Sequence, residues 1–166
     1  MIITELREEV QFGKYDVTIV GKRQKRNMSH DLIQYINSSI LVVNKYDAKN
    51  FNRVLLPVDD YPGSMKAAKY AIRVALSYDV GIDILNVLDE NKSKNEDSSS
   101  VSKIIKLIRR SGVDHKYIKE DGDPVEKIIE KSNNDKIIVM RASNMSPIKR
   151  YFRGSKPLSV MNSCNV

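Results

Sequence analysis

The sequence is short of the residues that build disulfides, metal sites and membrane spans. Cys164 is the single cysteine in 166 residues, which excludes an intramolecular disulfide and a metal site made of several cysteines. No apolar run reaches the roughly 18 residues that a membrane helix needs. The first residues also lack the basic and then apolar pattern of a secretory signal. We therefore expect a cytoplasmic protein with no membrane segment in this chain.

Residues that could carry catalysis are scarce as well. The two histidines, His30 and His115, lie far apart in the sequence and lack cysteine or carboxylate partners at the spacing of metal ligands. No set of nucleophile, base and orienting group can be recognised. The sequence therefore predicts no catalytic residue, no metal site, and a protein that is not an enzyme.

Positive charge is in excess, with a formal net charge of +7. A net positive charge of this size is typical of proteins that bind nucleic acids. The basic loop Lys22, Arg23, Lys25 and Arg26, however, contains no aromatic residue on which a base could stack. We interpret the excess as a solvated, lysine-rich surface and do not expect a nucleic-acid partner.

Strand patterns recur from residue 52 onward, separated by helix patterns. The strands are predicted at residues 52–59, 81–88, 113–118 and 137–140. A polar, serine-rich loop at 91–100 interrupts the series. Strands that alternate with helices predict an α/β fold with a parallel sheet and right-handed crossovers. Ligands of such sheets bind at the carboxyl ends of the strands, near the switch in strand order.

Three helices connect these strands. Ser64 is predicted to cap a helix over 65–77, whose apolar residues at helical spacing are Ala68, Ala71, Ile72, Ala75 and Leu76. A second helix covers 101–108 and stops at Gly112. The third begins at Asp123-Pro124, an N-cap followed by proline at the first helical position.

The first fifty residues carry a shorter pattern of the same kind. Helices are predicted at 6–12 and 31–36, strands at 16–21 and 40–43, and a polar linker at 47–52. Ile19-Val20-Gly21 matches Val139-Met140-Arg141, each at a strand end before a basic loop, and 36–39 matches 161–164. These matches coincide with the secondary-structure pattern, which favours an internal repeat.

A candidate anion site follows the last predicted strand. The segment 147–155 joins that strand to a helix-like segment and ends in Gly154-Ser155, with Lys149, Arg150, Arg153 and Lys156 inside or beside it. A strand, a loop with Gly-Ser and a helix place backbone N–H groups and the positive helix end before a phosphate. The alternative is a simple turn with an N-cap for the last helix.

From Arg53 onward the chain resembles a universal stress protein domain. The resemblance rests on the strand 53–59, the alanine-rich helix after Ser64, the strand 84–90, the Gly-Asp-Pro segment 122–129, and Val139 to Ser155. It implies a doubly wound parallel sheet with helices on both faces, of the adenine nucleotide alpha hydrolase-like type. On this interpretation residues 1–46 resemble the closing part of a first repeat, 47–52 form a linker, and 53–166 form a domain lacking its final strand.

The resemblance also implies a nucleotide site. Members that bind ATP carry the pattern G-x2-G-x9-G-[ST], and this chain has Arg141 and Asn144 at the first two glycine positions, followed by Gly154 and Ser155. The implied nucleotide-binding residues are Asp59, Val87, Met140, Arg141, Asn144, Gly154, Ser155 and Lys156. The implied ligand is ATP or AMP with Mg²⁺ or Mn²⁺, bound by a non-catalytic regulatory protein.

The two replaced glycines leave a second interpretation open. Glycine permits positive φ and close backbone approach, which Arg141 does not offer, and so the chain is alternatively a dimerising regulatory module that has lost nucleotide binding. A sheet without its last strand has an unpaired edge. We expect 40–43 to cover that edge in cis or from another subunit, and therefore a homodimer or higher homo-oligomer.

Overall fold

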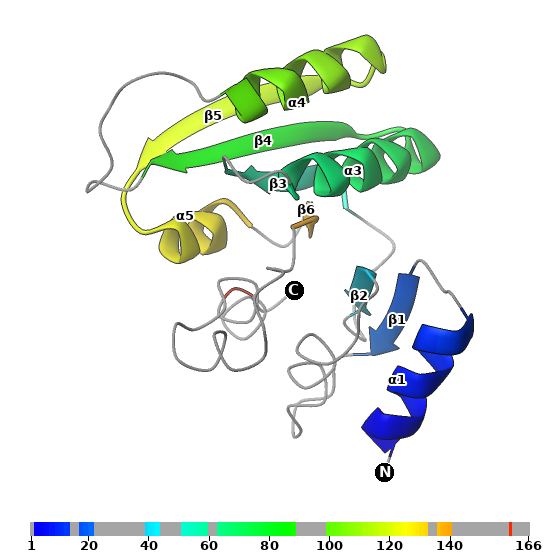
Figure 1. The fold of residues 1–166 in the computed structure, drawn as a ribbon. Coiled ribbons are helices and arrows are strands. Elements are labelled where there is room, and N and C mark those ends of the chain that lie inside the picture. Colours follow the sequence, from blue (N-terminus) through cyan, green and yellow to red (C-terminus); the bar gives the residue numbers. More distant parts are fainter. Residues whose placement is uncertain are drawn as a thin grey trace.

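The computed structural model describes residues 2–13, 17–21, 39–43, 51–59, 63–88, 99–132, 136–140 and 160. These residues form two parallel sheets with their helices (Figure 1). Within them, no helix is long and apolar enough to cross a membrane.

The larger sheet has four parallel strands in the order β5-β4-β3-β6. Their bounds are Arg53–Val58 for β3, Gly81–Leu88 for β4, His115–Asp121 for β5 and Lys136–Ile138 for β6. The first strand of this sheet in the sequence, β3, is an inner strand. The next two strands, β4 and β5, are added in turn on one side of β3, and β6 then pairs with β3 on its other side. The strand order therefore switches between β3 and β6, where open α/β sheets bind ligands.

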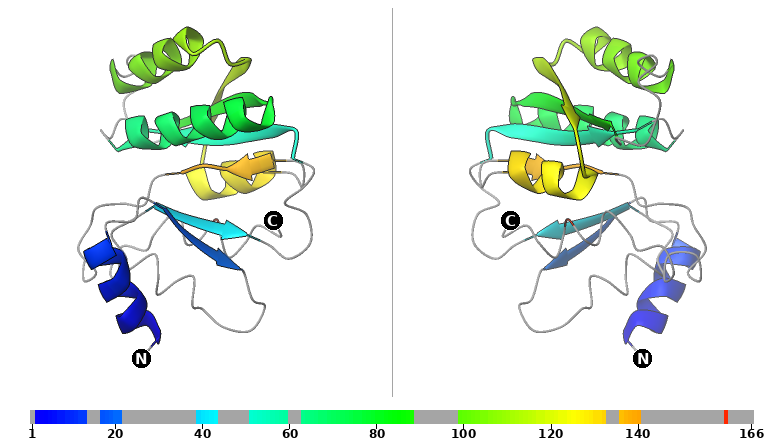
Figure 2. Two further views of the ribbon diagram at one scale, coloured as in Figure 1. Left: turned by 90° about the vertical axis from the view of Figure 1, so that its right-hand side faces the viewer. Right: turned by 90° about the vertical axis from the view of Figure 1, so that its left-hand side faces the viewer.

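Helices cover both faces of this sheet (Figure 2). On one face lie α3 (Ser64–Tyr78) and α4 (Ser99–Arg110), whose buried residues include Ala68, Ala71, Ile104 and Ile108. On the other face lies α5 (Pro124–Lys131), where Ile128 packs with Leu55, Leu85 and the helical residue Val160. Alternate residues of the strands point to opposite faces, so the near-continuous apolar runs of β3 and β4 fit a sheet covered on both sides.

The smaller sheet pairs β1 (Val17–Gly21) with β2 (Ser39–Val43) in parallel, with Val17 opposite Ser39. The helix α1 (Ile2–Gly13) precedes it, and Val10 on this helix is buried. In Figures 1 and 2 the pair β1-β2 lies on the β6 side of the larger sheet. This is the edge that the sequence predicted residues 40–43 to cover.

The predicted α/β architecture is confirmed, and the predicted strand 81–88 matches β4 in full. The third strand is displaced, because the structure begins β5 at His115 and extends it to Asp121. Because β5 is an edge strand, it can contain exposed polar residues such as Lys119 and Asp121, and these residues hid the end of the strand in the sequence pattern. Leu76, one of the apolar residues at helical spacing, is 59% exposed in the last turns of α3. The predicted helix at 31–36 lies outside the described residues.

Candidate functional site

The candidate site is the carboxyl edge of the larger sheet, where Asp59 follows β3 directly. Asp59 is exposed and adjoins the switch point between β3 and β6. Its carboxylate accepts a hydrogen bond from Oγ of Ser64, and its backbone nitrogen lies 3.4 Å from the same oxygen. Ser64 is 3% exposed. The buried hydroxyl therefore fixes an exposed carboxylate at the end of the central strand.

This contact corrects the prediction that Ser64 caps α3. Gly63 occupies the N-cap position, without a side-chain capping hydrogen bond, and Ser64 is the first helical residue. A serine at an N-cap would accept a bond from a backbone N–H two or three residues later. Here the hydroxyl is directed back to Asp59 instead. The serine thus links the helix start to the strand end.

Val87 and Met140, also predicted site residues, come from β4 and from the residues after β6. Both are half-buried and pack against the cluster of Leu55, Leu85, Ile128 and Val160 on the α5 face. Their side chains therefore contribute to the core. At the carboxyl ends of the strands, only the backbone N–H and C=O groups of these two residues are left to contact a ligand. The remaining predicted residues, Arg141, Asn144, Gly154, Ser155 and Lys156, lie outside the described residues, as does the loop 147–155.

A buried polar pair beside Val87 was not predicted from the sequence. Asn86 is 6% exposed, and its Nδ2 donates to the hydroxyl of Tyr117 on the neighbouring strand at 3.1 Å. In the sequence Asn86 sits within an apolar strand pattern, which marks it as unusual but does not reveal its partner. The pair fixes the backbone of β4 one residue before Val87.

The turn after β5 lies at the same carboxyl end of the sheet, next to the end of β4. Gly122 has φ +127°, a conformation that residues with a Cβ rarely adopt, and its N–H donates to the carbonyl of Leu88 at 3.1 Å. Oδ1 of Asp123 accepts hydrogen bonds from the N–H groups of Val125 at 2.8 Å and Glu126 at 3.0 Å. The predicted Asp123-Pro124 start of α5 is therefore confirmed.

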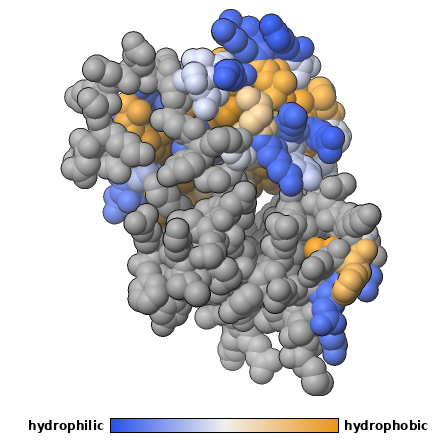
Figure 3. All heavy atoms as spheres, in the orientation of Figure 1, coloured by the Kyte–Doolittle hydropathy of each residue, from blue (hydrophilic) through white to orange (hydrophobic). Residues whose placement is uncertain are grey.

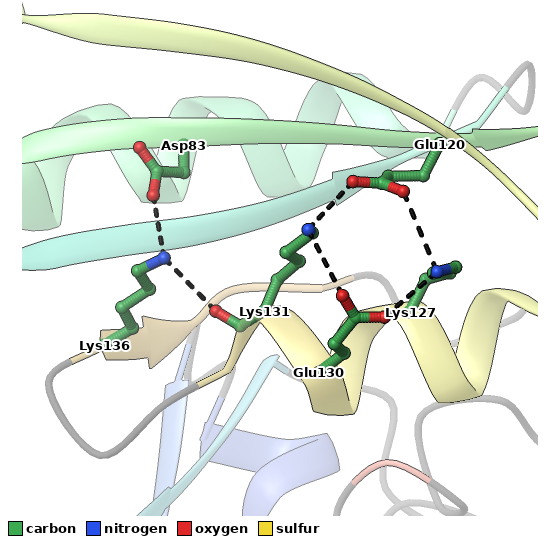
Figure 4. A network of polar contacts seen from close by, with 6 residues as sticks. All are labelled: Asp83, Glu120, Lys127, Glu130, Lys131 and Lys136. Carbon is green, nitrogen blue, oxygen red and sulfur yellow. Dashed lines mark hydrogen bonds and ion pairs between the residues drawn. The ribbon is translucent and has the colours of Figure 1, made fainter.

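Lysines of α5 hold Glu120 against the helix (Figure 4). Glu120 lies 2.8 Å from Nζ of Lys131 and 3.8 Å from Nζ of Lys127, and both lysines also contact Glu130. The hydrogen bond from Lys131 lowers the pKa of Glu120 below its ordinary value. This network fastens α5 to β5, and it contains no carboxylate cluster suited to a cation.

A second network lies at the opposite, amino end of the sheet. The carboxylate of Asp83 is buried between Arg53, with Nε at 2.6 Å, and Lys136, with Nζ at 2.9 Å. The guanidinium of Arg53 also reaches Asp114 at 2.8 Å. Burial by itself would raise the pKa of Asp83, but hydrogen bonds from Lys136 and Arg53 outweigh it and hold the pKa below its usual value. These charges satisfy one another and join three strands.

In the described part of the chain, no group of three or more His, Cys, Asp or Glu residues could hold a metal ion. His115, one of the two histidines, lies with Nδ1 3.1 Å from the carbonyl of Val113. The arrangement therefore offers an oriented carboxylate, backbone groups at strand ends and a helix start. It is suited to binding a polar ligand at the switch point.

The fold defines an α/β protein whose parallel sheet carries helices on both faces. Residues 50–166 match the sequence model of the Universal stress protein family. The match covers more than half of the chain, and the chain belongs to this family. A search among curated proteins found no match.

Solved structures of universal stress proteins share the fold. One from Archaeoglobus fulgidus DSM 4304 superposes with a TM-score of 0.76 at 20% identity, covering 99% of this chain and 62% of that protein. A universal stress protein in complex with cAMP superposes with a TM-score of 0.58 at 16% identity, covering 71% of this chain and 94% of that protein. Another universal stress protein from Archaeoglobus fulgidus superposes with a TM-score of 0.53 at 17% identity, covering 69% of this chain and 93% of that protein. The present chain thus spans 62% of the length of the first of these proteins.

Proposed function

We propose that this protein is a non-catalytic, nucleotide-binding regulator that acts in the cytoplasm. The observation that carries the proposal is the exposed carboxylate of Asp59, held by buried Ser64 at the strand-order switch. An oriented carboxylate at this edge is suited to accept hydrogen bonds from the hydroxyls of a ribose. The complex of a related universal stress protein with cAMP supports an adenine nucleotide as the ligand class.

The proposed site runs from Asp59 across the strand ends. Asp59 and the backbone at Val87 would bind the nucleoside, and Met140 leads the chain into the segment with Arg141, Asn144, Gly154, Ser155 and Lys156. That segment would bind the phosphates of ATP or AMP, with Mg²⁺ or Mn²⁺ bridging phosphate oxygens. Val87 suits a backbone role because its side chain is committed to the core.

Calorimetric titration with ATP, AMP and cAMP, each with Mg²⁺ or Mn²⁺, tests the proposal. Micromolar binding of at least one of them is expected. Asp59→Asn should weaken it about tenfold or more, because an amide replaces a charged acceptor. The matched control is Asp121→Asn, another exposed carboxylate at a strand end, but on the edge strand β5. Equal affinity of Asp59→Asn and wild type would refute the nucleoside site, and Gly154→Asp examines the phosphate end separately.

The second candidate function is a dimerising regulatory module without a nucleotide. The observation that favours it is the pair Arg141 and Asn144 at positions where nucleotide-binding members have glycine. A homodimer or higher homo-oligomer is expected under either function. Light scattering at high concentration measures the mass, and a clean monomer would contradict the assembly.

We also propose that residues 1–46 are the closing part of a first universal-stress-like repeat, joined by a linker at 47–52 to the domain from residue 53. The parallel pairing of β1 with β2 supports this division, because the closing strands of such a repeat would run side by side in the same direction. The similarity over 99% of this chain to the longer Archaeoglobus fulgidus protein supports it as well.

A further inference from the structure

The outer surface of the layer formed by α3 and α4 carries a concentration of positive charge. On α3 the exposed cations are Lys66, Lys69 and Arg73, which follow the spacing i, i+3 and i+7. Residues at that spacing share one face of a helix. The buried residues of α3, such as Ala68, Ala71 and Ala75, belong to the opposite face. The three cations therefore point away from the sheet.

The same spacing recurs on α4. Lys103, Lys106 and Arg110 are exposed at i, i+3 and i+7, and Arg109 adds a fourth exposed cation. Val101, Ile104 and Ile108 fill the inward face of this helix. Because α3 and α4 pack side by side on the same face of the sheet, their outward rows share one surface. We call these seven cations the basic face.

No carboxylate balances the basic face from within the two helices, because neither α3 nor α4 contains Asp or Glu. Among the described residues, none of the seven cations makes an ion pair with a carboxylate. Asp79 lies beyond the end of α3, and Asp114 is paired with Arg53 at 2.8 Å. In Figure 3 hydrophilic residues, interspersed with hydrophobic ones, lie over the part of the molecule that α4 and α3 occupy in Figure 1. The charge there is as large as the formal net charge of the whole chain, +7.

We propose that the basic face binds the phosphate backbone of a nucleic-acid duplex, without preference for sequence. Seven residues of helix rise about 10 Å, and packed helices lie about 8–10 Å apart, so the two rows form a patch about 10 Å in each direction. A duplex carries one charge per roughly 1.7 Å of its axis, enough for several phosphates to meet such a patch at once.

The side chains on this surface are suited to phosphate rather than to base recognition. The guanidinium of Arg73 lies over the ring of Tyr70, 5.8 Å from its centroid, which leaves the N–H groups at its rim for phosphate oxygens. Tyr70 itself is half-buried, and Arg73 lies over its ring, where a base would otherwise stack. Contacts through charge alone give sequence-independent binding.

An anionic membrane fits the basic face less well. Helices that lie on bilayers insert an apolar face beside their cations. The exposed residues of α4 are serine, lysine and arginine, since its apolar side is occupied by the core. On α3 the exposed apolar side chains, Leu76 and Tyr78, are confined to its carboxyl-terminal end. The observations therefore favour a phosphate backbone over lipid.

The expectation of no nucleic-acid partner rested on the basic loop 22–26, which lies in a different part of the sequence. The basic face is spread over two segments separated by about thirty residues, and the fold brings them together. Each segment alone reads as an ordinary amphipathic helix. Sequence inspection for a dense basic run could not find this surface.

Fluorescence anisotropy with a labelled 20-base-pair DNA duplex and a duplex RNA, from 20 to 200 mM salt, tests the proposal. The charge-reversed pairs are Lys69→Glu with Arg73→Glu on α3, and Lys103→Glu with Lys106→Glu on α4. The matched control is Lys22→Glu with Arg23→Glu, which changes the net charge of the protein equally. Circular dichroism verifies that each variant folds.

Wild type is expected to bind either duplex with an affinity that falls steeply with salt. Each helix pair should weaken binding about tenfold at low salt and reduce the salt slope by about 0.9 for each lost phosphate contact. The loop pair should retain wild-type affinity. No binding by wild type, equal losses in helix and loop pairs, or binding only to phosphatidylserine vesicles would each overturn the proposal.

Discussion

Ser64, at the start of α3, donates its hydroxyl hydrogen to the carboxylate of Asp59, at the end of β3. The donor is buried and the acceptor is exposed, so the core of the protein positions a charged group at its surface. The contact joins two residues five positions apart, one at the end of the central strand and one at the start of the helix that follows it.

Ser64→Ala should therefore affect both stability and ligand binding. Loss of the hydrogen bond is expected to lower the free energy of unfolding by about 1 kcal/mol, measured by urea titration. The proposed nucleotide should also bind more weakly, because the Asp59 carboxylate is no longer held in one orientation. Ser111→Ala is the control, since its hydroxyl donates to the Ile108 carbonyl at the far end of the domain. Comparable loss of nucleotide affinity in both variants would contradict the positioning role.

Asp83→Asn should destabilise the protein strongly at neutral pH. Removal of this buried charge leaves Lys136 without its carboxylate partner and Arg53 with Asp114 alone, and a loss of about 3 kcal/mol is expected. Asp114→Asn, in which the exposed partner of Arg53 is changed, should cost less than about 1 kcal/mol. Urea titrations of both variants at pH 7 compare these losses in the free energy of unfolding. Equal losses would show that the burial of Asp83 does not strengthen its contribution to stability.

The same network has a defined dependence on pH. The pKa of Asp83 is lower in the folded protein than in the unfolded chain, so the folded state favours its charged form. Its contribution is complete above the ordinary carboxyl pKa of about 3.9 and is lost as the pH falls through the lowered folded value. The stability difference between wild type and Asp83→Asn should therefore shrink below about pH 4. A difference that persists unchanged to pH 2 would be inconsistent with this linkage.

Gly81→Ala should disturb the network indirectly. A Cβ at Gly81 would lie only 2.5 Å from Nη1 of Arg53, so the guanidinium would have to move from its carboxylate partners. In a double-mutant cycle, Gly81→Ala should be less costly in an Arg53→Ala background than in wild type. Thermal unfolding of the four proteins provides the measurement, and strict additivity would disprove the steric explanation.

Asp123→Ala should loosen the start of α5. Two backbone N–H groups lose their acceptor, and about 1 kcal/mol of stability is expected to be lost. Asp121→Ala, two residues earlier at the end of β5, serves as the control. Hydrogen exchange should quicken at Val125 and Glu126 in the first variant and remain unchanged in the second.

Much of the fold could be predicted because its signals are local. The strand of residues 81–88 and the Asp123-Pro124 helix start depend on neighbours in the sequence, and both are confirmed. Leu76 lies four residues after Ile72, at helical spacing, and is nevertheless exposed, because spacing does not tell where the covering sheet ends. The extent of β5 was missed because its polar end resembles a loop.

The candidate site was predictable in place but not in its supporting contacts. Asp59 follows from its position after a buried strand, whereas the role of Ser64 depends on how the start of α3 is placed against the end of β3. Asp83 interrupts an apolar strand, yet its partner Arg53 lies 30 residues away. Contacts of this range are decided by strand order, which a single sequence leaves open between several arrangements.

The buried carboxylate of Asp83 also constrains how the strands can be aligned. Because side chains alternate between the two faces of a strand, a slip of β6 by one residue would turn Lys136 to the opposite side of the sheet. Asp83 would then keep Arg53 but lose its second cation, inside the protein where an unmatched charge is expensive. A run of apolar residues such as Ile137 and Ile138 could tolerate that shift, whereas the ion pair between Lys136 and Asp83 penalises a one-residue slip.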